Sequence, residues 1–115
     1  MNKDINDYKQ TIYAECMEPD GFAAKIRENK VDEVAFKKLI GAIQSYTHEI
    51  SNENSIDRLI VGCLFELPWE IENTIEHYNA QSMYLGEKVS RMAEELRENI
   101  NELLWIGLEA SYRNI

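Results

Sequence analysis

Glycine and proline are scarce in this sequence of 115 residues, with five and two copies respectively. Apolar residues recur at steps of three and four instead of alternating, which predicts amphipathic helices and excludes a sheet-based fold. The hydrophobic share of 44% also excludes intrinsic disorder. We therefore expect an all-α protein.

Metal-ligating residues are equally scarce, because the chain has two histidines and two cysteines and lacks a CxxC motif. A di-iron bundle needs Glu-x-x-His pairs, but Ser45 precedes His48 by three residues and Thr74 precedes His77 by three. Zinc and haem sites also lack ligands. We expect no metal and no cofactor, and we expect both histidines to be surface or hydrogen-bonding residues at the C-terminal ends of helices.

The start of the sequence has no apolar signal-peptide core, and the longest apolar run, 59–65, is too short to span a bilayer. These absences predict a cytoplasmic protein that has no membrane partner. We expect Cys16 and Cys63 to be reduced and buried, because both lie in amphipathic or apolar helical segments.

Positive charge is the minority sign, with 12 Lys and Arg against 21 Asp and Glu, and the formal net charge is −9. A surface this acidic repels phosphate backbones and anionic lipids. Nucleic acid is therefore not an expected partner.

The apolar periodicity predicts one domain, 1–115, folded as a compact bundle of five to six helices with a long C-terminal helix. We expect Asp20, Asp32, Ser55 and Ser82 to cap four of the helices. The expected segments are 5–16, 21–28, 33–50, 56–67, 68–78 and 82–110.

Two of these segments carry more specific expectations. The segment 56–67 is apolar on almost every side, which predicts that it is the central helix of the core. The last segment is long for a domain of this size, so its end must fray, pack on a partner or break near Gly107.

Negative charge is concentrated between residues 53 and 80, which hold six acids and one base, Arg58. The aromatic residues Trp69 and Tyr78 flank this acidic string and are either interface anchors or core aromatics. The string itself is either a solvated acidic face or a binding face for a basic partner. The candidate partner-binding residues are Glu66, Trp69, Glu70, Glu72, Glu76 and His77.

A second acidic motif, formed by Glu94, Glu95 and Glu98, resembles the EExxE magnesium motif of all-α nucleotide pyrophosphohydrolases. Those enzymes also need an ExxD pair on a following helix, and only Glu102 and Glu109 remain downstream. The motif is alternatively a charged helix face, with arginines nearby for pairing within the helix.

The segment 58–73, RLIVGCLFELPWEIEN, resembles the small, acidic, all-helical immunity proteins of bacterial contact-dependent toxin systems. The resemblance implies a non-enzymatic cytoplasmic protein that binds and neutralises the C-terminal domain of one cognate toxin, often a basic nuclease. Two alternatives remain open, namely a pyrophosphohydrolase that uses the EExxE carboxylates and a self-associating regulatory module.

Overall fold

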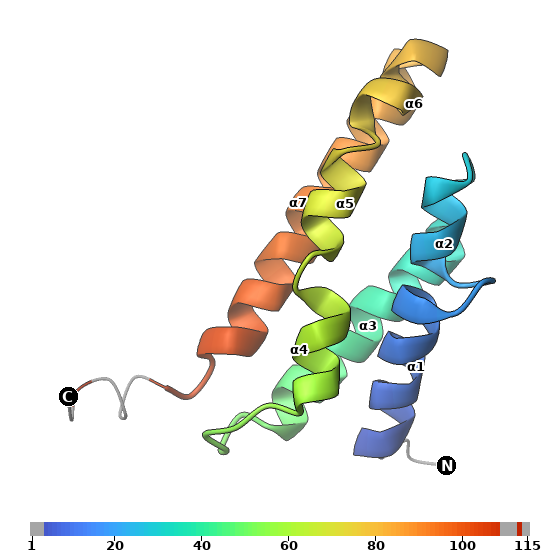
Figure 1. Ribbon diagram of the computed structural model, residues 1–115. Coiled ribbons are helices and arrows are strands. Elements are labelled where there is room, and N and C mark those ends of the chain that lie inside the picture. The colour runs from blue at the N-terminus through green and yellow to red at the C-terminus, as the bar shows by residue number, and fades with distance from the viewer. Residues whose placement is uncertain (1–3, 109–112, 114–115) are drawn as a thin grey trace.

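The computed structural model describes residues 4–108 and 113, and within them the chain is helical without a β-strand. The helices, drawn in Figure 1, are α1 (Ile5–Met17), α2 (Phe22–Arg27), α3 (Glu33–Glu49), α4 (Arg58–Leu64), α5 (Leu67–Glu72), α6 (Ile75–Gln81) and α7 (Met83–Trp105). The predicted all-α class and the long C-terminal helix are confirmed.

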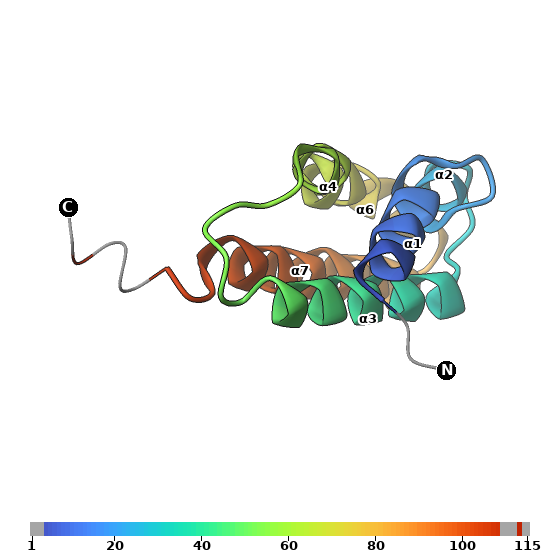
Figure 2. The same cartoon turned by 90° about the horizontal axis from the view of Figure 1, so that it is seen from below.

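The chain forms successive rods that run in opposite directions, namely α1–α2, α3, α4–α6 and α7. In Figure 1 the chain runs up through α1 and α2, down through α3, up through α4, α5 and α6, and down through α7. Figure 2 shows α3 and α7 side by side in one layer, with α1–α2 and α4–α6 in the other. No helix in the described ranges is long and apolar enough to cross a membrane.

Side-chain caps start several of the helices. Asp32 accepts a hydrogen bond from the backbone of Ala35, and Ser82 accepts one from Leu85, as the sequence predicted. Two predicted caps are wrong by one or two residues. Gly21 replaces Asp20 at the start of α2, and Asp57 replaces Ser55 at the start of α4, where its carboxylate accepts from the Leu59 N–H.

The core contains the predicted apolar stripes, and α3 contributes the largest share. The buried residues of α3 are Ala35, Phe36, Leu39, Ile40, Ala42, Ile43, Tyr46 and Thr47. On α7, Val89, Met92, Leu96 and Leu103 are buried, and on α1 Ile12 and Cys16 are. The core therefore lies along the face of α3 on which α1 and α7 pack.

The prediction that 56–67 forms the central helix is wrong. Its helix, α4, is only seven residues long, and Leu59 and Phe65 are 53% and 78% exposed. Only one side of this rod packs on the bundle, so an all-round apolar segment leaves the other side in water. The apolar residues of this segment therefore contribute both to the core and to the exposed surface of the protein.

The predicted helix 68–78 is also split, into α5 and α6. The Thr74 amide donates to the Ile71 carbonyl, three residues back, and the Thr74 hydroxyl donates to the same carbonyl at 2.7 Å. This tightened turn replaces the regular hydrogen bond between residues four apart. Asn73 and Thr74 stay close to helical dihedral angles, so α6 continues roughly along the line of α5 in Figure 1.

Of the three outcomes expected for the end of the last helix, the structure shows a break near Gly107. It ends at Trp105, and Gly107 has a φ of 73°, a left-handed conformation that glycine adopts without steric cost. A Cβ at Gly107 would collide with the Ser51 carbonyl, so the backbone at Gly107 packs closely on the loop after α3. The predicted continuation of the helix to residue 110 is wrong at 106–108, which are not helical, and residues 109 and 110 lie outside the described residues.

One buried hydrogen bond ties the second layer together. The Tyr78 hydroxyl, on α6, donates to the Ile26 carbonyl of α2 at 2.6 Å, and burial raises the pKa of this hydroxyl. Tyr78 is 1% exposed. The ends of the first and third rods are therefore joined by a hydrogen bond that water cannot replace.

Tyr78→Phe should lower the free energy of unfolding by about 1–3 kcal/mol, because it leaves the Ile26 carbonyl without its donor in a buried position. Urea denaturation followed by circular dichroism measures the change. Tyr13→Phe, at a 40% exposed position, serves as the control and should leave the stability nearly unchanged. Equal effects of the two substitutions would contradict the role of this hydrogen bond.

Ion pairs between the rods predict a loss of stability in acid. Lys9 lies 2.9 Å from Asp57, and the hydrogen bonds that Asp57 accepts from Lys9 and from the Leu59 amide hold its pKa below the usual range. Hydrogen bonds from Lys25 and the Ala35 amide lower the pKa of Asp32, and Lys88 lowers that of Glu33. The unfolded chain then binds more protons than the folded chain between the two sets of pKa values.

The stabilisation from these carboxylates is complete above their unfolded pKa values, about 4, and is lost as the pH falls through their lower folded values. We expect the urea midpoint to fall steeply below about pH 5. Asp57→Asn keeps a capping side chain but removes the charge, so it should lower stability at neutral pH and reduce the fall in acid. A pH profile identical to that of the parent chain would refute this assignment.

Candidate partner-binding surface

The candidate surface lies on the third rod, where α4 passes into α5. Pro68 is the second residue of α5 and has no backbone N–H, so it cannot continue the hydrogen-bond ladder of α4. Phe65 and Glu66, between the two helices, still have helical dihedral angles. The hydrogen-bond ladder is therefore interrupted between α4 and α5, and it resumes where the Glu70 N–H donates to the Glu66 carbonyl.

Two aromatic side chains at this junction point into solvent. Phe65 is 78% exposed and Trp69 is 62% exposed. Glu66 lies between them in sequence and is also exposed. We call Phe65, Glu66, Trp69 and the acids of α5 and α6, Glu70, Glu72 and Glu76, the acidic–aromatic surface.

Trp69 and Tyr78 fall into different environments, although the sequence left both open. Trp69 is exposed and available to a partner, whereas Tyr78 is buried and holds α6 against α2. The difference follows from register, because Tyr78 lies three residues after Ile75 on the inward side of α6, while Trp69 precedes the inward-facing Ile71 by two.

Two carboxylates of the acidic string form ion pairs with arginines of other helices. Glu70 forms an ion pair of 3.5 Å with Arg27 of α2, and Glu72 pairs with Arg97 of α7. Arg58 is the only base near these acids in the sequence, whereas Arg27 and Arg97 are 43 and 25 residues distant and only the fold brings them close. Within residues 4–108, Glu66 and Glu76 form no ion pair.

His77, a candidate partner-binding residue, is exposed and also contacts two neighbouring polar side chains. Its Nε2 lies 3.0 Å from Asn29 Oδ1 and 3.1 Å from the Gln81 side chain. It is the third residue of α6, so the expected location at a C-terminal helix end is wrong for His77 and correct for His48, in the last turn of α3. The hydrogen-bonding role predicted for His77 is confirmed.

An apolar depression of about 200 Å³ adjoins the surface, between the third rod and the end of α7. Phe65 and Pro68 form one wall, and Ile100 and Leu104 form the other. Arg97, which pairs with Glu72, also lines it. Sequence reasoning missed this depression, since it assigned Phe65 to the core.

The EExxE carboxylates do not converge. Glu94, Glu95 and Glu98 are all exposed on α7, and of the three only Glu95 lines a hollow that lies between α3 and α7. Arg97, one of the arginines near this motif in the sequence, pairs with Glu72 of α5 and not with the carboxylates of the motif. In the part of the chain that the structure describes, no three His, Cys, Asp or Glu side chains are grouped so as to hold a metal ion.

The two cysteines are buried, as predicted. Cys16 on α1 and Cys63 on α4 are unpaired thiols, and burial is the main cause that raises the pKa of each. Thiolate formation is suppressed at neutral pH, so neither side chain is suited to nucleophilic chemistry.

Comparison with known proteins gives no further assignment, because no protein family, no curated protein and no solved structure matches this chain.

Trp69→Ala should change the free energy of unfolding by about 0.5 kcal/mol or less, because the side chain is mostly in water. Ile71→Ala, two residues away and fully buried, should cost about 2–5 kcal/mol. Urea unfolding curves of the two variants measure the contrast. A large loss of stability in Trp69→Ala would show that Trp69 belongs to the core and not to a binding surface.

Proposed function

We propose that this chain is a non-enzymatic binding protein that neutralises a cognate bacterial toxin domain, as the immunity proteins do. The single observation that supports this proposal best is the exposure of Phe65 and Trp69 beside Glu66. All three residues belong to the stretch that resembles the immunity proteins. The proposal implies a cytoplasmic location.

The aromatic pair provides the affinity in this proposal. Large aromatic side chains dominate the energetics of protein interfaces, and exposed apolar patches rimmed by polar groups are typical of binding sites. The apolar depression beside Phe65 offers space for one side chain of the partner. Removal of these surfaces from water would lengthen the lifetime of the complex.

The acids supply selectivity for a basic partner. Glu66 and Glu76 form no ion pair within the described ranges, and the whole chain carries a net charge of −9. A nuclease-type toxin has a cationic cleft for its substrate, so carboxylates on this surface would accelerate association at low salt. Glu70 and Glu72 contribute less, because Arg27 and Arg97 already oppose them.

The direct test uses the gene immediately upstream of this one. The proposal predicts that this gene encodes a toxin whose C-terminal domain stops growth when expressed alone, and that co-expression of the present chain restores growth. A toxic domain that this chain neither binds nor neutralises would overturn the proposal. Release of pyrophosphate from nucleoside triphosphates with Mg²⁺, lost in Glu95→Gln, would favour the enzyme alternative instead.

A matched pair of double variants tests the surface. Glu66→Lys with Glu76→Lys should abolish neutralisation, and should slow association most at low salt because it sets cations against cations. Glu94→Lys with Glu98→Lys makes the same charge change on α7 and should neutralise as well as the parent. Calorimetry and stopped-flow association measure both, with circular dichroism as the folding control.

Equal loss in the two double variants would show that only net charge matters and would remove the assignment to this surface. A parent chain whose mass in solution rises with concentration, with Trp69→Ala restoring the monomer, would favour the self-association alternative. Trp69→Ala in the toxin complex should mainly accelerate dissociation.

A further inference from the structure

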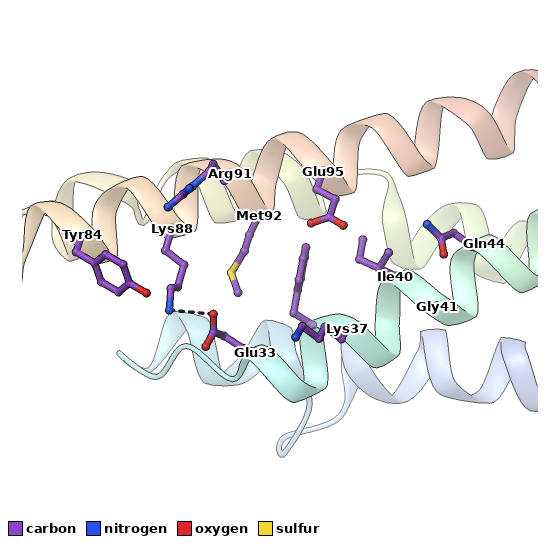
Figure 3. Close-up of a pocket in the computed structure, with 11 residues that line it drawn as sticks. Glu33, Lys37, Ile40, Gly41, Gln44, Tyr84, Lys88, Arg91, Met92 and Glu95 are labelled. Atoms are coloured by element: carbon purple, nitrogen blue, oxygen red, sulfur yellow. Dashed lines mark ion pairs between the residues drawn. The ribbon is translucent and has the colours of Figure 1, made fainter.

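A second hollow, distinct from the acidic–aromatic surface, lies between α3 and α7. It has a volume of about 460 Å³, within the range of small-molecule sites. Figure 3 shows side chains from both helices directed into it. The lining residues are Glu33, Phe36, Lys37, Ile40, Gly41, Gln44, Tyr84, Lys88, Arg91, Met92 and Glu95. We call this hollow the α3–α7 groove.

The floor of the α3–α7 groove is apolar. Phe36, Ile40 and Met92 each keep 5–6% of their surface exposed, so they belong to the core while they line the groove. Tyr84, 61% exposed, adds an aromatic ring at one end. A ligand with an apolar body could therefore cover core side chains from the outside without opening the bundle.

The rim of the groove is cationic, which is unusual on this acidic chain. Three of the 12 Lys and Arg residues line it, with two acids. Lys88 lies 2.9 Å from Glu33 and 4.6 Å from the centre of the Tyr84 ring, and this pair crosses the groove in Figure 3. Lys37, Arg91 and Glu95 are the other charged residues that line the groove, so the lining carries an excess of one positive charge.

We propose that the α3–α7 groove binds a small amphipathic carboxylate, a molecule with an aliphatic chain and one anionic headgroup. The chain lies on Phe36, Ile40 and Met92, and the headgroup meets one of the two rim cations without an ion pair among the described residues, Lys37 on α3 or Arg91 on α7. An anion is favoured because the rim has one excess cation, and an aliphatic body is favoured because the polar groups lie at the rim and not on the floor.

Two glycines allow the groove to be closed without damage to the fold. Gly41 lines the groove and lies within α3, and a Cβ at this position would have no atom within 4 Å. Gly62, within α4, is equally open but lines none of the hollows described here. Gly41→Leu fills the groove, and Gly62→Leu is its matched control. Both replace a helical glycine by a strong helix former, so neither should lower the melting temperature.

The probe is decanoate, used below its micelle concentration, with decylamine and decanol as the cationic and neutral analogues. Decanoate should bind the full-length chain saturably and shift the methyl NMR signals of Met92 and Ile40. Gly41→Leu should abolish binding, and Gly62→Leu should bind like the parent. Whichever of Lys37→Gln and Arg91→Gln removes the cation that meets the headgroup should weaken binding about two- to fivefold, as expected for an exposed charge contact.

Three results would overturn the proposal. They are the absence of saturable decanoate binding, binding of decylamine or decanol as tight as that of decanoate, and equal binding by Gly41→Leu and the parent. Shifts confined to residues around Phe65 would locate the ligand in the other depression and would also refute it. None of these results bears on toxin neutralisation, because the groove shares no residue with the acidic–aromatic surface.

Discussion

The apolar face of α3 is the constraint on which the rest of the bundle depends. This helix lies against α1 on one side and against α7 on the other, and its eight buried residues form the largest part of the core. The third rod has no comparable helix, since α4, α5 and α6 have six or seven residues each. Helices of that length are marginal in isolation, so packing on α7, α1 and α2 maintains them.

Periodicity was sufficient to predict the long helices, because α1, α3 and α7 each place one regular apolar stripe against a neighbour. It failed in the third rod, where several local effects compete. Pro68 removes a backbone donor and Thr74 tightens a turn, so short-range hydrogen bonding sets the helix ends there. The apolar content of 56–67 is similar on all sides, and it contains no signal for which side faces the bundle.

The sequence was sufficient to predict which residue types form the candidate surface, but not which of its carboxylates form ion pairs. Glu66 and Trp69 are exposed as a binding face requires. The pairing of Glu70 with Arg27 and of Glu72 with Arg97 depends on contacts between distant segments, which residue counts along the chain cannot detect. Phe65 was missed for a related reason, since an aromatic residue in an apolar run reads as core.

The division of the third rod into three short helices has a consequence for local unfolding. Each junction ends one cooperative hydrogen-bond ladder, so a single segment can open without melting the whole rod. The backbone amides of α4, α5 and α6 should therefore exchange with solvent deuterium faster than those of α3. Phe65 and Glu66 lie at such a junction, where the backbone can change conformation locally while α3 and α7 keep their register.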